Sequence, residues 1–139
     1  MPKHTFKVEW GDTDAAGIVF YPNYYRWMDN STHAFFETIG YSSVVLFEED
    51  RMGLPILEAN CRFFTPSFFG NRIEVTSEIA EVKDKVFRIE HTFRRGETLL
   101  AQGYEVRAWT DFSNGKPKAQ PIPDELREKF MHHLKQEIS

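Results

Sequence analysis

The sequence contains only one cysteine, Cys61, among its 139 residues. A single cysteine cannot close an intramolecular disulfide, so the fold must be stabilised by its core. The chain also lacks any run that comes near the roughly 20 apolar residues needed to span a bilayer. Its first residues show no apolar stretch typical of a secretory signal. We therefore expect a cytoplasmic protein that is not inserted into a membrane.

An excess of positive charge is missing as well. The chain has 17 Lys and Arg against 21 Asp and Glu, a formal net charge of −4. General nucleic-acid binders usually carry a basic excess that neutralises phosphates, so nucleic acid is not an expected partner. Apolar residues, in contrast, make up 41% of the chain, enough to bury one core. Because no repeat or linker divides the sequence, we expect one domain over residues 1–139.

The first half of the chain shows a strand pattern followed by a helix pattern. Residues 5–10 alternate between apolar and polar, as in a half-buried strand, and the segment 11–17 ends that alternation. From Pro22 to Thr38, apolar and small residues recur every three or four positions, which predicts an amphipathic helix that ends before Gly40. The apolar run in residues 41–49 has no clear period, so we expect a short helix or an irregular segment there.

The second half is dominated by strand patterns. Tight turns at residues 83–85 and 95–97 predict antiparallel hairpins. Residues about 122–138 predict a C-terminal amphipathic helix. The fold class is therefore α+β, with an antiparallel sheet of about five strands covered by one long helix, plus the C-terminal helix. Four segments are predicted to be the later strands: residues 54–64, 72–82, 85–94 and 99–111.

Two acids, Asp12 and Asp14, lie on the loop before the long helix, beside small residues that end with Gly17. The N-terminus of a helix offers free N–H groups and the positive end of its dipole, which stabilise an oxygen that becomes negative. A carboxylate next to such a site is the minimum that acyl transfer needs. A plain turn in which the Asp side chains cap the helix explains the same spacing, and the spacing alone does not decide.

A metal site is not expected in this loop. An EF-hand-like calcium loop would need oxygen ligands where the sequence has Ala16, and Glu where it has Asn23. His132 and His133 are adjacent in the predicted C-terminal helix and point to different faces, so they are not a metal pair. Cys61 has no partner base in the sequence pattern and is interpreted as a small buried residue.

The loop and the start of the helix resemble a known family. The sequence GDTDAAGIVFYPNY at residues 11–24, followed by RWMD at 26–29, resembles the signature of the 4-hydroxybenzoyl-CoA thioesterases and their hot-dog relatives. The resemblance extends to about Asp111. It implies a hot-dog fold, in which the sheet wraps around the long helix, and a homodimer with active sites at its interface, often paired into a tetramer. It also implies an acyl-CoA thioester as substrate, with no cofactor and no metal.

The resemblance assigns roles to several residues. It makes Asp14 the catalytic acid, acting as nucleophile or as general base for water, and the main-chain N–H of Tyr21 the group that polarises the thioester carbonyl. Asp29 would accept a hydrogen bond from a phenolic hydroxyl, although a solvent-facing helix residue fits equally well. Asn60 would orient water or the acyl group, and a structural amide is the alternative. Tyr24 belongs to the aromatic residues expected near the acyl group, although such residues are often simple core.

The family binds the CoA phosphates with a basic cluster in the turn before its fourth strand. Lys83 and Lys85 match that cluster, with an acid between them, and Arg88 or Arg62 are further candidates. A solvated hairpin turn explains the two lysines equally well. His33 lies one turn beyond Asp29 on the predicted helix and is interpreted as a surface or core residue.

The sequence therefore predicts an acyl-CoA thioesterase, and an aromatic acyl group such as 4-hydroxybenzoyl is the first hypothesis. Alternatives within the same class are a dihydroxynaphthoyl-CoA and a short aliphatic acyl-CoA. An alternative from another class is a non-catalytic subunit that binds acyl-CoA.

Overall fold

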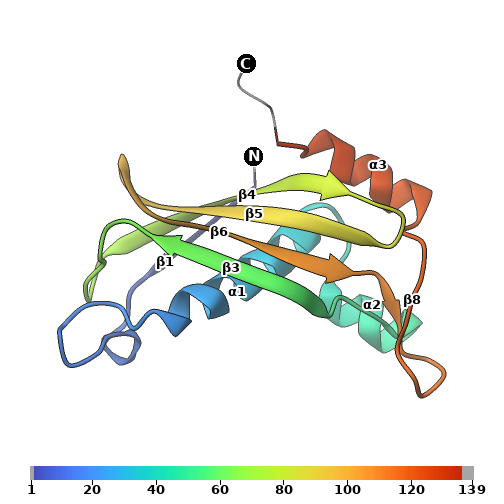
Figure 1. Ribbon diagram of the computed structural model, residues 1–139, viewed down its shortest axis with the longest axis horizontal. Coiled ribbons are helices and arrows are strands. Elements are labelled where there is room, and N and C mark those ends of the chain that lie inside the picture. The colour runs from blue at the N-terminus through green and yellow to red at the C-terminus, as the bar shows by residue number, and fades with distance from the viewer. Residues whose placement is uncertain (1, 136–139) are drawn as a thin grey trace.

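The computed structural model describes residues 2–135 and has one main antiparallel sheet with a long helix across one face (Figure 1). The strand order in this sheet is β1-β4-β5-β6-β3. A second, three-stranded sheet has the order β2-β7-β8. The main strands are β1 (Lys3–Lys7), β3 (Ile56–Phe63), β4 (Arg72–Val82), β5 (Val86–Arg95) and β6 (Thr98–Ala108), and the short ones are β2 (Met52–Gly53), β7 (Thr110–Asp111) and β8 (Lys118–Ala119).

Helix α1 (Pro22–Thr38) has the bounds that the sequence pattern predicts. Pro22 opens it, because a residue without an N–H costs nothing in the first turn. Its buried face packs so closely on β6 that Gly103 has no room for a side chain. A Cβ there would lie 2.6 Å from the Met28 sulfur and 2.6 Å from the backbone oxygen of Asn60. The glycine thus sets how near the helix lies to the sheet.

Helix α2 (Ser43–Asp50) follows α1 and resolves the ambiguous segment after Gly40 as a helix. Helix α3 (Asp124–His132) covers the sheet next to β4 and β5 (Figure 1). Its buried residues Leu126 and Phe130 join a core cluster with Phe36 and Phe87. A second cluster, at the end of the sheet near the loop before α1, includes Tyr24, Trp27 and Phe93.

The C-terminal helix is shorter than predicted. It was expected over residues 122–138, but it ends at His132, and the chain then pairs with the edge of β4. The N–H of Lys135 donates to the Ile79 oxygen at 2.6 Å, and the Ile79 N–H donates to the His133 oxygen at 2.9 Å. Ile138, used in that prediction, lies outside the described residues. No helix within residues 2–135 is long and apolar enough to cross a membrane.

Candidate active site

Asp12 is a structural residue of the loop before α1. Its side chain is buried, accepts the Glu9 N–H at 2.7 Å and forms an ion pair with Arg26 at 2.7 Å. Its backbone oxygen accepts the side-chain amide of Asn23 and the N–H of Phe20, both at 2.8 Å. These bonds fasten the loop to the first turn of the helix. Asp12 has no side-chain oxygen left for chemistry.

Asp14, two residues later, is exposed and only partly engaged. Its Oδ1 accepts the Ala16 N–H at 2.9 Å, and within residues 2–135 no donor bonds to its second oxygen. Gly17 closes the turn by donating its N–H to the Asp14 backbone oxygen at 2.9 Å, with a φ of 82° in the left-handed region. The loop therefore holds the carboxylate at one oxygen and leaves the other free to attack or to accept a proton.

The backbone at Tyr21 presents a free donor at the start of α1. Tyr21 precedes Pro22, which has no N–H, and the next two amides are already bonded: Asn23 donates to Phe20 at 3.0 Å and Tyr24 to Tyr21 at 3.1 Å. Among the described residues, the Tyr21 N–H has no acceptor. It lies at the positive end of a 17-residue helix, so an oxygen that develops negative charge would be stabilised here.

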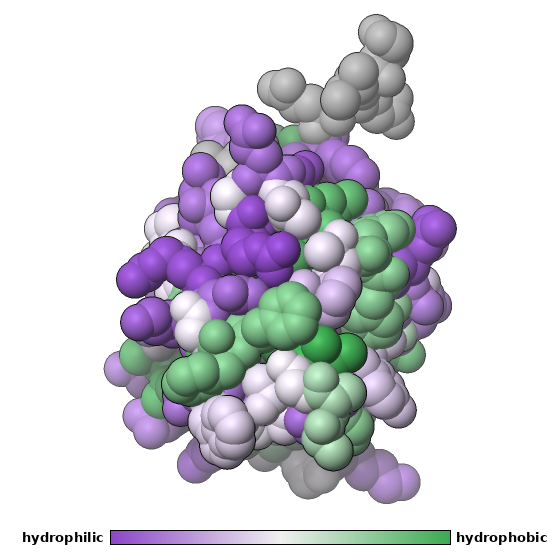
Figure 2. Space-filling view, turned by 90° about the vertical axis from the view of Figure 1, so that its left-hand side faces the viewer, coloured by the Kyte–Doolittle hydropathy of each residue, from purple (hydrophilic) through white to green (hydrophobic). Residues whose placement is uncertain are grey.

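A cleft of about 390 Å³ with four aromatic residues in its lining opens beside Tyr21. The rings of Tyr21 and Tyr24 lie 6.3 Å and 5.3 Å from that of Phe63. The Tyr24 hydroxyl is buried and contacts Ser67, and this burial raises its pKa. Figure 2 faces this end of the molecule and shows apolar side chains gathered in a band below polar ones. The cleft is lined by Ile18, Val19, Tyr21, Tyr24, Phe63, Phe64, Thr65, Pro66 and Ser67.

Asp29, the predicted partner of a phenolic hydroxyl, does not lie at this cleft in the same chain. It is two turns further along α1, about 12 Å from Tyr21 at 1.5 Å per residue. Its Oδ1 accepts the Nη2 of Arg107 at 2.6 Å. Asp14 and Gly17 thus share one turn of the loop before α1, Tyr21 and Tyr24 line the cleft, and Asp29 lies elsewhere.

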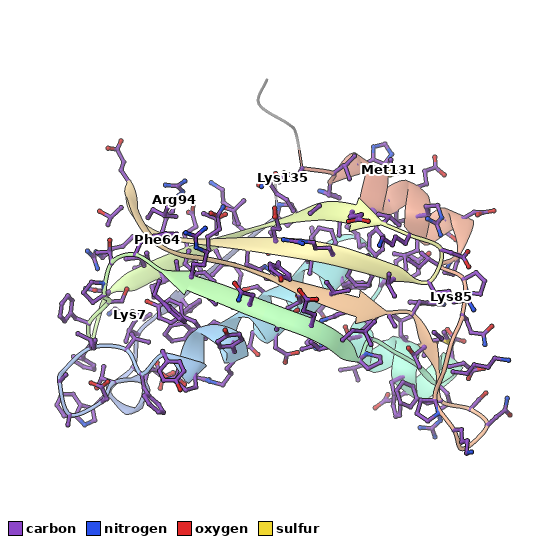
Figure 3. All side chains as sticks on the ribbon, in the orientation of Figure 1. Lys7, Phe64, Lys85, Arg94, Met131 and Lys135 are labelled. Carbon is purple, nitrogen blue, oxygen red and sulfur yellow. The ribbon has the colours of Figure 1, made fainter. Side chains whose placement is uncertain are left out.

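The predicted CoA-binding residues also lie away from Asp14 within one chain. Lys83 and Lys85 belong to the turn after β4, at the far end of the sheet from the loop that holds Asp14 (Figure 3). Lys83 forms an ion pair with Glu81 at 3.4 Å. Their role toward CoA stays a prediction.

Two other predicted residues share the sheet face that points away from α1. Arg88 stacks on Tyr104, with its guanidinium 3.7 Å from the ring centre, and Tyr104 bonds to Glu58. Asn60 pairs with Tyr104 across β3 and β6, on the same face. Neither Asn60 nor Arg88 contacts the cleft of its own chain, because alternate residues of a strand point to opposite faces.

A buried polar network beneath α1 was not predicted. Thr32 donates to Glu105 at 2.6 Å and contacts His91 at 2.9 Å, while Arg107 donates to Glu105 at 2.8 Å. Burial, with the charge of Arg107, lowers the pKa of His91 to about 3. The alternation in β5 contained a signal, since His91 occupies the phase of the buried Ile89 and Phe93.

Other reactive groups of the described chain offer little for catalysis. Burial raises the pKa of Cys61 to about 11, so its thiol stays protonated near neutral pH. Among residues 2–135, no three His, Cys, Asp or Glu side chains are grouped as metal ligands would be.

Comparison with known proteins gives consistent results. Residues 8–130 match the family model of the Thioesterase-like superfamily. The chain is 27% identical over 124 residues to 4-hydroxybenzoyl-CoA thioesterase of Pseudomonas sp. (strain CBS-3), covering 84% of this chain and 88% of that protein. It is 28% identical over 125 residues to 1,4-dihydroxy-2-naphthoyl-CoA hydrolase of Prochlorococcus marinus (strain MIT 9515), covering 86% and 82%. Among solved structures, a gentisyl-coenzyme A thioesterase is 41% identical, with a TM-score of 0.83 and coverage of 93% of this chain and 98% of that one.

Proposed function

The chain belongs to the Thioesterase-like superfamily and is an acyl-CoA thioesterase with a hot-dog fold, and on this premise we propose that Asp14 is its catalytic carboxylate. The observation that carries the proposal is that the loop before α1 and the N-cap residue of that helix each hold an unused group. One is the second oxygen of Asp14, and the other is the N–H of Tyr21. A nucleophile or base beside an unused donor is what thioester hydrolysis requires.

In the proposed reaction, the thioester carbonyl oxygen accepts the Tyr21 N–H and develops negative charge there. Asp14 then acts by one of two routes. In the first, its free oxygen attacks the carbonyl carbon, the C–S bond breaks, CoA leaves as thiolate, and water hydrolyses the mixed anhydride. In the second, Asp14 takes a proton from water as that water attacks the carbonyl carbon, and the C–S bond then breaks so that CoA leaves as thiolate. Both routes give a free acid and CoA, and neither uses a cofactor.

We propose an aromatic acyl group with a hydroxyl substituent as the substrate. The cleft beside Tyr21 is lined by aromatic rings, which suit a flat acyl group. Relatives of this chain are named for hydroxybenzoyl, dihydroxynaphthoyl and gentisyl thioesters. The hypothesis of 4-hydroxybenzoyl-CoA is therefore kept within this wider class, and a short aliphatic acyl-CoA is the alternative.

A homodimer formed through β3 completes the proposed site. β3 is an edge strand, and Ile56 and Leu57 on it are 45% and 60% exposed. The cleft adjoins one end of β3 at Phe63, while Asp29 is linked through Arg107 to Leu54, just before the other end. A two-fold axis that pairs two β3 strands antiparallel would bring these opposite ends together.

Such a pairing would set Asp29 of the partner subunit at the far end of the cleft, where it can meet the acyl hydroxyl. It would also turn Lys83 and Lys85 of the partner subunit toward the end of the molecule where the CoA phosphates emerge. The separation of these residues within one chain is then no argument against their roles. Assembly of two dimers into a tetramer remains the prediction from the family resemblance.

The test measures CoA release with a thiol reagent. The panel is 4-hydroxybenzoyl-CoA, benzoyl-CoA, 1,4-dihydroxy-2-naphthoyl-CoA, gentisyl-CoA and a short aliphatic acyl-CoA, offered to the wild type, Asp14→Asn and Asp50→Asn. Asp50 is an exposed acid at the end of α2, so its variant is the matched control. We expect turnover that is lost only in Asp14→Asn. Binding without turnover in the wild type would favour the non-catalytic subunit, and turnover that persists in Asp14→Asn would refute the role of Asp14.

A further inference from the structure

Arg107 is a buried arginine whose charge is already neutralised within the core. It is 3% exposed, and its Nε donates to the Glu105 carboxylate at 2.8 Å. Glu105, 1% exposed, also accepts the Thr32 hydroxyl at 2.6 Å. The Nη1 of Arg107 donates to the Leu54 backbone oxygen at 2.8 Å. Arg107 and Glu105 therefore neutralise each other and have hydrogen-bond partners in the core, without a contact to a surface residue.

The remaining nitrogen of Arg107 reaches a second carboxylate, that of Asp29. Nη2 donates to Asp29 Oδ1 at 2.6 Å. The side chain of Asp29 is 45% exposed, so the guanidinium connects the core to the surface of α1. Buried ion pairs are weak evidence for stability, because desolvation offsets much of the attraction. Stabilisation of the fold therefore does not explain the contact between Arg107 and Asp29.

Asp29 is restrained from a second side by His33. The Nε2 of His33 lies 3.3 Å from the same Oδ1, and its Nδ1 lies 2.7 Å from the Ser43 hydroxyl at the start of α2. Within residues 2–135, no donor bonds to Oδ2 of Asp29. The carboxylate thus presents one fixed oxygen outward, and that oxygen accepts hydrogen bonds but cannot donate them while it is ionised.

We propose that Arg107 is a positioning residue for substrate selection, which holds Asp29 so that its outward oxygen accepts a hydroxyl of the acyl group. The inference rests on the proposed thioesterase function and on the β3 dimer, which turns Asp29 toward the cleft of the partner subunit. A rigid acceptor discriminates more strongly than a mobile one, because less freedom is lost on binding. The enzyme therefore prefers hydroxylated aromatic acyl-CoA thioesters over the unsubstituted ring.

The test compares kcat/KM for 4-hydroxybenzoyl-CoA, and for its 2- and 3-hydroxy isomers, with kcat/KM for benzoyl-CoA. Asp29→Asn turns the outward acceptor into a donor, and Arg107→Lys keeps the charge but cannot reproduce the planar three-way contact. We expect each variant to reduce the wild-type preference for its best hydroxylated substrate by about tenfold, the value of one hydrogen bond to a charged group. Turnover of benzoyl-CoA is the reference in this ratio, so a general loss of activity cancels and only the response to the hydroxyl group is measured.

Arg94→Lys is the matched control, because Arg94 is an exposed arginine of β5 (Figure 3) and should keep both the preference and the melting temperature. If Arg107→Lys does not fold, His33→Asn decides, since it removes the lateral contact to Asp29 from a half-exposed position. It should lower the preference in the same direction.

Three results would overturn the inference, and they are distinguishable from failure of the proposed function. The first is Asp14-dependent turnover with no preference for a hydroxyl group in the wild type. The second is a preference that Asp29→Asn abolishes but Arg107→Lys leaves intact, which would make Arg107 purely structural. The third, if Arg107→Lys does not fold, is a preference that His33→Asn leaves unchanged. If the wild type instead turns over none of the acyl-CoA substrates, the proposed function and this inference are both refuted.

Discussion

Nε2 of His91 lies 2.9 Å from the hydroxyl oxygen of Thr32, and the direction of that bond is fixed by its neighbours. The Thr32 hydroxyl donates its only proton to Glu105, so it accepts from His91. His91 therefore carries its proton on Nε2, and its Nδ1 accepts the Ser77 hydroxyl at 2.8 Å. Every polar atom of the ring is satisfied in the neutral form, and protonation would remove the bond from Ser77.

This arrangement predicts an acid-labile fold. The pKa of His91 falls from 6.5 to about 3 on folding, mainly through burial and also through the charge of Arg107. Between pH 6.5 and about 3, His91 is protonated in the unfolded chain but neutral in the folded one. The free energy of unfolding therefore falls by about 1.4 kcal/mol for each unit by which pH is lowered. Above pH 6.5 the group contributes no pH dependence. The free energy of unfolding should be measured with urea for the wild type and His91→Gln from pH 4 to pH 7. Plotted against pH, it should have a shallower slope in the variant.

His132→Gln serves as the control for that experiment, because His132 is exposed on α3. It should keep the wild-type slope. Equal slopes in wild type and His91→Gln would mean that carboxylates alone cause the acid sensitivity.

Gly103 should be intolerant of even one added methyl group. A Cβ at this position would lie 2.6 Å from the Asn60 backbone oxygen, so the sheet itself would have to shift. Overpacking of this kind costs about 1–3 kcal/mol. Chemical denaturation of Gly103→Ala should show that loss, whereas Gly11→Ala, with no atom within 4 Å of its Cβ, should not. A Gly103→Ala variant as stable as the wild type would mean that α1 can retreat from β6 at little cost.

Gly17 should matter for catalysis more than for stability. Its φ of 82° lies in the left-handed region, where an alanine costs about 1–2 kcal/mol. Because the Gly17 N–H bonds to the Asp14 backbone, Gly17→Ala should disturb the carboxylate and lower kcat about tenfold, as small misplacements do. Gly115→Ala, at the same φ of 82° in the turn between β7 and β8, should lose similar stability and keep kcat. A similar kcat in the two variants would argue against a role for the turn at Gly17.

Strong local patterns made much of this fold predictable. The bounds of α1 and β4 were predicted correctly, because Pro22 and the strict alternation in residues 72–82 are unambiguous signals. The end of α3 was predicted wrongly, because the apolar spacing of Leu126, Phe130 and Leu134 continues past it. β1 covers β4 only as far as Thr76, and the chain after α3 pairs with the open edge at Ile79. Pairing with this edge competes with continuation of the helix. Because it depends on tertiary structure, it cannot be seen in the local periodicity.

The site divides in a similar way. The arrangement of the loop could be predicted because Asp14, Gly17 and Tyr21 are neighbours in sequence before one helix, and their catalytic roles stay a prediction. The link from Asp29 to Arg107 joins residues 78 positions apart, and nothing in either segment announces it. Charges on β6 are also misleading, because Glu105 and Arg107 occupy buried positions that usually hold apolar residues.

The last prediction separates the two acids of the loop, which the sequence presents as near equivalents. Asp12→Asn removes a charge that bonds to Arg26 and leaves one side-chain oxygen to serve two donors, so it should destabilise the protein by about 1–3 kcal/mol. Asp14→Asn keeps an oxygen for the Ala16 N–H and should melt within a few degrees of the wild type. Its kcat should fall by about 10²- to 10⁴-fold, the range of a lost general base. Thermal unfolding and CoA release, measured on both variants, test this division. The reverse pattern, with activity lost in Asp12→Asn and stability lost in Asp14→Asn, would transfer the catalytic role to Asp12.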